Sequence, residues 1–159
     1  MHEIPRQIMD NMKTNPYMEA ALEQAQAAGA RGEVPVGAIV VGPGGGIIAA
    51  AGNETRAQSD PTAHAEVLAI RAACAQLGQE RLVGAVLYVT LEPCAMCAGA
   101  ISHARIGRVV YGASDPKSGG TDHGARVFDH PQCHHKPEVV GGISQAACAK
   151  LLKDFFAAR

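Results

Sequence analysis

The sequence lacks a long hydrophobic run, an excess of one charge and a recognisable leader segment. No window approaches about 18 uninterrupted apolar residues, so we expect no membrane-spanning helix. The formal net charge is −1 over 159 residues, whereas a protein that binds duplex nucleic acid through bulk charge is usually basic. Any nucleic-acid contact is therefore expected to be local and to depend on shape. Residues 1–15 contain no apolar stretch after a basic start, so we predict a flexible tail and no secretory signal.

Disulfide frameworks are also disfavoured, because the five cysteines are an odd number. This count suits a reducing compartment, and we expect a cytoplasmic protein. The chain is 47% hydrophobic and 18% charged, a balance typical of a compact globular fold. No internal repeat or long linker divides it. We therefore predict the 1–15 tail followed by one domain over residues 16–159.

Hydrophobic periodicity predicts strands and helices that alternate along the chain. Short apolar runs bounded by turn residues predict strands, and apolar residues spaced three and four apart predict helices. The predicted strands are 34–41, 47–53, 85–91 and 108–114, and the predicted helices are 16–29, 63–78, one carrying residues 94–97 and one around 148–155. Asn15 is expected to cap the first helix, and Asp60 or Thr62 the second. This alternation indicates a layered α/β fold with helices covering a sheet.

Two cysteines three positions apart, Cys94 and Cys97, follow a predicted strand and Pro93. At a helix N-terminus they would share one face, and the helix dipole would favour their thiolate forms. His64 lies at the start of another predicted helix and would add an imidazole. Zinc prefers four ligands in a tetrahedron, so three protein ligands leave one position for water. This arrangement is typical of a catalytic zinc site.

Glu66 lies two positions after His64 and is the candidate proton carrier. Residues two apart on a regular helix point about 200° away from each other. Either His64 therefore lies in a frayed first turn, or both side chains reach across the helix end. The pattern His-x-Glu followed by Pro-Cys-x-x-Cys is the signature of zinc nucleobase deaminases. In that chemistry Glu66 would take a proton from the zinc-activated water, give it to a ring nitrogen and later protonate the departing amine.

Two other interpretations of the thiols remain open at this point. Cys-x-x-Cys also occurs in redox pairs and in structural zinc sites, and the segment 130–135 ("HPQCHH") could supply a fourth ligand. The catalytic site is favoured because a closed site would leave Glu66 without a task. The remaining candidate ligands are interpreted as core, helix-end or loop residues: Cys74, His103, Cys133, His134, His135 and Cys148.

Between Val34 and Lys117 the chain resembles the bacterial tRNA-specific adenosine deaminases. The resemblance is carried by "EVPVGAIVV", "AGNETR", "DPTAHAEVLAIR", "LYVTLEPCAMCAGAI" and "ARIGRVVYGASDPKSG". It implies a cytidine deaminase-like fold, a three-layer αβα sandwich with a five-stranded mixed sheet. It implies hydrolytic deamination of the wobble adenosine of a tRNA anticodon to inosine, with one zinc ion per subunit of a homodimer. The alternative is a zinc-dependent deaminase of free nucleobases or nucleosides.

The same resemblance implies which residues contact the substrate. Asn53 would lie near the ribose of the target nucleoside, and Val36 with its neighbouring backbone near the adenine. Asp115 would approach the ribose of the adjacent nucleotide, with Lys117 nearby. Plain structural roles are the alternatives, because Asn53 could cap a turn and Asp115 could begin one. Only Arg159 is basic in the C-terminal "DFFAAR", so contacts between this tail and RNA phosphates are expected to be weak.

Overall fold

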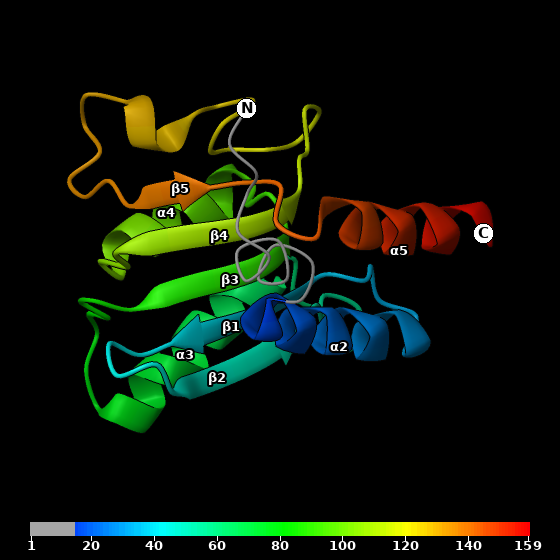
Figure 1. Cartoon of the computed structure of the whole chain (residues 1–159), viewed down its shortest axis with the longest axis horizontal. Helices are drawn as coiled ribbons and strands as arrows, with labels where there is room; N and C mark the ends of the chain where they lie inside the picture. The colour runs from blue at the N-terminus through cyan, green and yellow to red at the C-terminus, as the bar shows by residue number, and fades with distance from the viewer. Residues whose placement is uncertain (1–14) are drawn as a thin grey trace, which may run out of the picture.

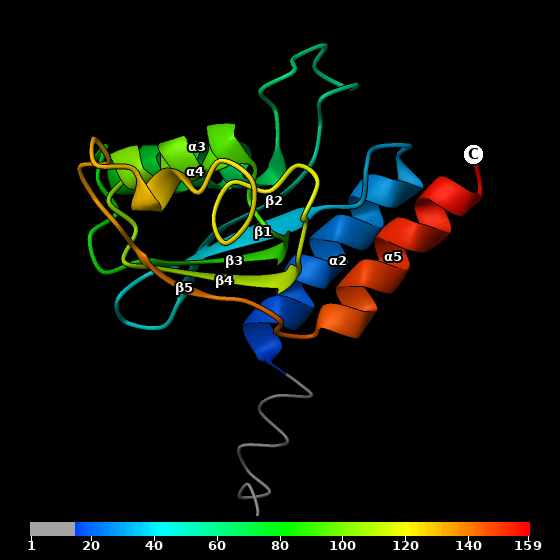
Figure 2. The ribbon, with the colours of Figure 1, turned by 90° about the horizontal axis from the view of Figure 1, so that it is seen from above.

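A five-stranded mixed sheet lies between two layers of helices in the computed structural model, which describes residues 15–159 (Figures 1 and 2). The helices are α2 (Pro16–Ala30), α3 (Ala65–Leu77), α4 (Ala95–His103) and α5 (Gln145–Ala157), with a short 3-10 helix η1 (Val127–Asp129). The strands are β1 (Gly37–Val41), β2 (Ile47–Gly52), β3 (Val86–Leu91), β4 (Arg108–Ala113) and β5 (Glu138–Val140). The expected αβα sandwich is confirmed. Apart from Asn15, the tail expected over residues 1–15 lies outside the described residues.

The strand order β2-β1-β3-β4-β5 joins an antiparallel half of the sheet to a parallel half. β1 pairs antiparallel with β2 and with β3, whereas β3, β4 and β5 run parallel. Helix α4 makes the crossover from β3 to β4. Because helices cover both faces, the central strands are mostly apolar, and all five residues of β1 are buried.

The two faces of the sheet carry separate hydrophobic cores. Helices α3 and α4 cover one face, and α2 and α5 lie side by side on the other (Figure 2). Along β3 the side chains alternate, so Leu87 and Val89 face the first core and Tyr88 faces the second. Ile101 of α4 is fully buried in the first core. Each such aliphatic side chain contributes about 1.5–3 kcal/mol by leaving water, which anchors α4 and the cysteines at its start.

One of the two predicted helix caps agrees with the structure, and the other does not. Asn15 caps α2 as expected, because its Oδ1 accepts the amides of Tyr17 and Met18 at 3.0 and 3.1 Å. The capping prediction for the second helix is wrong. His64 occupies the N-cap position of α3, and the Asp60 carboxylate instead accepts the amide and hydroxyl of Thr62. Local turn bonds of this kind compete with capping.

The first predicted strand, 34–41, also begins later than expected, at Gly37. The Val36 amide donates to the Val34 carbonyl at 2.8 Å, a tight turn that delays pairing. The longest described helix, α2, has 15 residues. Within residues 15–159, no helix combines the length and hydropathy needed to cross a bilayer.

Candidate active site

His64, Cys94 and Cys97 meet where helices α3 and α4 begin. His64 and Cys94 are the N-cap residues of the two helices and both have extended backbones, while Cys97 lies in the first turn of α4. The Nδ1 atom of His64 lies 3.5 Å from Sγ of Cys97 and 3.7 Å from Sγ of Cys94. Because His64 precedes the first helical residue, its side chain and that of Glu66 need not point in opposite directions. The structure is thus nearer to the first of the two alternatives, although His64 precedes the first turn of α3 and does not lie within it.

The separations of these donor atoms fit a zinc ion. Zn–N and Zn–S bonds of about 2.0 and 2.3 Å at a tetrahedral angle place nitrogen and sulfur about 3.5 Å apart. All three ligand atoms lie within 4.8 Å of one another. Among residues 15–159 no fourth histidine, cysteine or carboxylate joins them, so a coordination position is left for water. An imidazole with two thiols is also a donor set typical of zinc.

The protonation of the two thiols prepares this cluster for a cation. A hydrogen bond from the Cys97 thiol, with a second from His64, lowers the pKa of Cys94 to about 4 against burial. The pKa of Cys97 is raised, because it donates to Cys94 and is buried. The pKa of His64 is also raised, chiefly by its hydrogen bond to Cys94. These hydrogen bonds favour the thiolate form of Cys94, and a bound cation would favour ionisation of both thiols.

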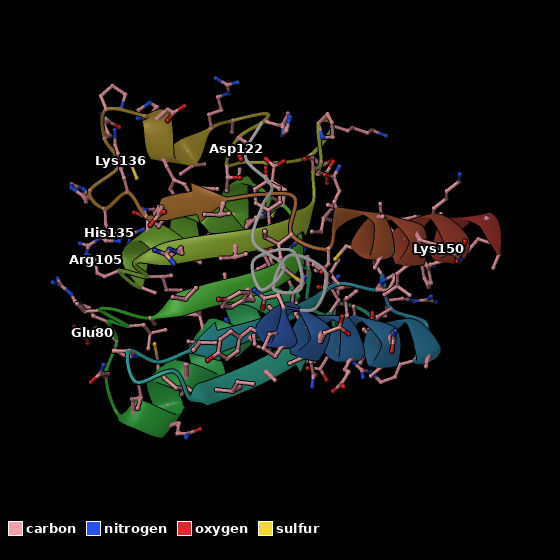
Figure 3. The ribbon with its side chains drawn as sticks, in the orientation of Figure 1. Glu80, Arg105, Asp122, His135, Lys136 and Lys150 are labelled. Carbon is pink, nitrogen blue, oxygen red and sulfur yellow. The ribbon has the colours of Figure 1, made fainter. Side chains whose placement is uncertain are left out.

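The segment expected as a possible fourth ligand has another role. The Cys133 thiol donates to the His135 carbonyl at 3.1 Å, and its Sγ atom lies 3.4 Å from Oγ of Ser102. The His135 Nε2 atom lies 2.6 Å from the Ile106 carbonyl. Figure 3 shows His135 beside the turn that carries Arg105, at the far end of α4 from the zinc ligands. These loop hydrogen bonds confirm the simpler interpretation of Cys133 and His135.

A pocket of about 240 Å³ opens beside the three ligands. It is lined by Val34, Val36, Asn53, Thr55, His64, Glu66, Leu91, Glu92, Cys94, Asp115 and Ser118. The Glu66 side chain is buried, and burial raises the pKa of its carboxyl above the usual value. A carboxyl with a raised pKa can both accept and return a proton near neutral pH. Of the expected substrate contacts, Lys117 is exposed and does not line the pocket.

Asn53 lines the pocket, and it also caps a helix rather than the turn that was considered; its contact with a ribose stays a prediction. Its Oδ1 accepts the Ala65 amide at 2.8 Å and so caps α3 from a distant position. Its side-chain NH₂ group takes no part in that bond, and the residue lines the pocket. Val36 also lines the pocket, but the backbone amides at Val36 and Gly37 already donate to the Val34 carbonyl and to Thr90 Oγ1. Val36 therefore presents an apolar wall there.

Two buried acidic residues, Glu33 and Glu92, were not predicted from the sequence to have a role in the site. Glu33 accepts the amides of Arg56 and Ala57, both at 3.0 Å, and so holds the segment that leads to the pocket residue Thr55. Glu92 lines the pocket itself and is 2% exposed. The sequence did carry one indication of both residues, since each is an acidic residue directly beside a predicted apolar strand. An acidic side chain buried at such a place requires hydrogen-bond or charged partners.

This α/β sandwich, with an imidazole and two thiols at two helix N-termini and a buried carboxyl beside them, defines a zinc-dependent hydrolytic deaminase. The family model for the cytidine and deoxycytidylate deaminase zinc-binding region matches residues 12–113. The chain belongs to this family. The match includes the three candidate zinc ligands and Glu66.

Relatives within the family agree over most of the chain. A tRNA-specific adenosine deaminase of Agrobacterium fabrum is 56% identical over 140 residues, which are 88% of this chain and 91% of the relative. One of Haemophilus influenzae is 46% identical over 142 residues, 89% of this chain and 82% of the relative. A solved structure from studies of A-to-I editing by tRNA:A34 deaminases aligns with a TM-score of 0.85 at 55% identity. It covers 87% of this chain and 99% of its own.

Proposed function

We propose that this protein deaminates adenosine to inosine at the wobble position of a tRNA anticodon. The observation that carries the proposal is the buried Glu66 carboxyl, in a pocket that also contains His64 and Cys94. The substrate assignment is supported by the two tRNA-specific adenosine deaminases and the tRNA:A34 deaminase structure to which the chain is similar.

The chemistry divides between the metal and the residues of the chain. Bound zinc would act as a Lewis acid that makes a water molecule acidic near neutral pH. Glu66 takes up one proton of the water inside the pocket and delivers it to a ring nitrogen. It then takes the second proton from the new hydroxyl on the ring carbon and gives it to the amine, which leaves as ammonia. Asn53 and Asp115 line the wall that orients the nucleoside, and Val36 contributes apolar contact to the base.

An anticodon loop suits a protein of this charge and pocket size. Its bases are unpaired, so extruding one into a pocket costs only a few kcal/mol. A net charge of −1 favours recognition through shape and a few polar contacts. Lys117 is exposed between the pocket residues Asp115 and Ser118, where it can meet the RNA backbone.

Two further features belong to this proposal. We assign the protein to the cytoplasm, where tRNA is its substrate and its five cysteines, all free, stay reduced.

We also assign a homodimer that uses the outer face of α4. Ala95 and Met96 are exposed there, and Met96 is 38% exposed only two positions after the ligand Cys94.

The test compares two substrate classes on zinc-loaded protein. Purified enzyme is incubated with transcribed arginine-isoacceptor tRNA and, separately, with free nucleosides and bases, and inosine is mapped in the RNA by sequencing. We expect inosine only at the wobble position, and none when Glu66→Ala protein is used. Deamination of the free compounds alone would reject the tRNA assignment and support the free-base alternative. Mass measurement in solution tests the dimer.

A further inference from the structure

We propose that Glu92 is a positioning residue: it holds residues 114–123 against the start of α4 so that Asp115 forms a fixed wall of the substrate pocket. Glu92 is the last residue before Pro93 and the ligand Cys94, so it lies where the sheet passes into the metal-binding helix. The inference rests on the proposed function, which identifies this pocket as the substrate site.

The Glu92 carboxylate is saturated by donors from that one segment. Oε1 accepts the Asp115 amide at 3.1 Å and lies 2.6 Å from Nδ1 of His123. Oε2 accepts the His123 amide at 3.0 Å and the hydroxyl of Thr121 at 3.3 Å, with the Thr121 amide at 3.4 Å. All of these donors come from a stretch that has no regular secondary structure. Its conformation therefore depends on this side chain.

The anchor is buried, and backbone amides surround it. The side chain of Glu92 is fully buried, whereas that of His123 is 37% exposed. Three backbone amides, those of Asp115, Thr121 and His123, donate to this one carboxylate. A second bond secures the same segment, because the Tyr111 hydroxyl donates to Asp122. Figure 3 shows Asp122 in the loop beyond β4.

The packing is equally specific at the two glycines of this segment. A Cβ atom at Gly119 would lie 2.4 Å from Oε2 of Glu92, and one at Gly120 would lie 2.5 Å from the backbone nitrogen of Ala95. The Gly120 amide also donates to the Pro93 carbonyl at 2.8 Å. The segment thus touches both Glu92 and the first turn of α4, which links the pocket wall to the metal-binding helix.

Glu92 and Glu66 line the same pocket with different tasks. The lone pairs of Glu92 are occupied by the segment it holds, so it acts on the substrate through Asp115. Asp115 itself lines the pocket, and its Oδ1 accepts the Ser118 amide at 2.9 Å, which fixes its side chain. Replacement of Glu92 should therefore weaken substrate binding more than the chemical step.

The test is a double-mutant cycle on zinc-loaded enzyme. Glu92→Gln replaces one carboxylate oxygen with an NH₂ group, which faces N–H donors and cannot accept their hydrogen bonds. The loss of one or two of these hydrogen bonds corresponds to about a tenfold rise in KM for an anticodon stem–loop RNA. We expect kcat within about threefold of wild type and unchanged zinc content. Asp115→Ala should also raise KM. The double variant should resemble Asp115→Ala alone, because a residue that acts through Asp115 adds nothing once it is gone.

The controls separate positioning from general destabilisation. Glu138→Gln removes a carboxylate that is 59% exposed and should match wild type in every measurement. If Glu92→Gln does not fold, Thr121→Val removes one hydroxyl donor to Glu92 and should give a smaller rise in KM. Hydrogen exchange of the Asp115 and His123 amides should accelerate in Glu92→Gln.

The outcomes distinguish this inference from the proposed function. Independent, multiplied effects on KM in the double variant, or unchanged hydrogen exchange at residues 115–123 in Glu92→Gln, would overturn the positioning role. If the wild type deaminates no tRNA, the proposed function fails. Hydrogen exchange still decides whether Glu92 holds the segment in place.

Discussion

The side chain of Asn53 caps a helix that begins 12 positions later, because its Oδ1 accepts the Ala65 amide at 2.8 Å. The residue in the N-cap position, His64, makes no capping hydrogen bond with its side chain. Its ring is directed instead at the thiols of Cys94 and Cys97. Asn53 thus satisfies a helix terminus that the zinc ligand leaves open.

This relationship predicts different results for two substitutions at Asn53. Asn53→Asp retains an oxygen acceptor for the Ala65 amide, so the free energy of unfolding should stay close to that of wild type. Asn53→Ala removes the cap and should lower it by about 1 kcal/mol. Both should reduce kcat/KM, because both remove the NH₂ group at the pocket. Chemical denaturation and steady-state kinetics measure the two effects, and equal destabilisation by both variants would contradict the capping role.

Replacement of Glu66 should separate metal binding from proton transfer. Glu66→Gln keeps the size of the side chain and removes the proton carrier, so kcat should fall by about 10²–10⁴-fold. Zinc content, measured by mass spectrometry of the metal, should remain at one ion per chain. A variant that retains full kcat would remove Glu66 from the mechanism.

Replacement of a ligand should have the complementary effect. Cys97→Ala leaves two protein ligands, so the purified protein should lose most of its zinc and its activity, and its melting temperature should fall. Chelation of the wild type should produce the same melting curve, restored by added zinc. Cys133→Ala is the matched control, because this thiol belongs to a loop; loss of zinc from it would place Cys133 in the metal site.

Stability should depend on pH through Glu33. The hydrogen bond from the Ala57 amide, together with a second from the Arg56 amide, lowers the pKa of the Glu33 carboxyl below its ordinary value in the folded state. A carboxyl whose pKa is lower in the folded than in the unfolded chain stabilises the fold at pH values above its unfolded-state pKa. This stabilisation is lost as the pH falls through the folded-state pKa. Wild-type stability should therefore decline on acidification below about pH 4.5. Denaturation at several pH values should give a shallower decline for Glu33→Gln, whereas Glu138→Gln should follow wild type.

Close packing predicts that Gly120 tolerates no side chain. In Gly120→Ala the added Cβ would lie 2.5 Å from the backbone nitrogen of Ala95, so the segment or α4 must move. Overpacking of this kind costs about 1–3 kcal/mol. Gly44→Ala is the control, because a Cβ there would meet nothing within 4 Å. Thermal unfolding of both variants tests the contact, and equal melting temperatures would argue against it.

The parts of the site that were predicted are those encoded over a few residues. The cysteine pair and the His64–Glu66 pair each lie within one helix start, where spacing alone places side chains. The capping bond of Asn53 and the bonds of Glu92 were missed, because their partners lie 12 and 23 to 31 positions away and only the tertiary fold brings them together. The fifth strand was expected only from the family resemblance, since three residues carry too little periodicity to predict a strand.

The division of the ligands between two helices has a consequence for how the protein matures. His64 and Cys94 are 30 positions apart, and β3, a central strand of the sheet, lies between their helices in the sequence. We therefore expect the sheet to form before the cation binds, unlike a small zinc finger, which the metal itself folds. We expect zinc uptake to be a late event, so that a nascent polypeptide released before Cys94 would form no zinc centre.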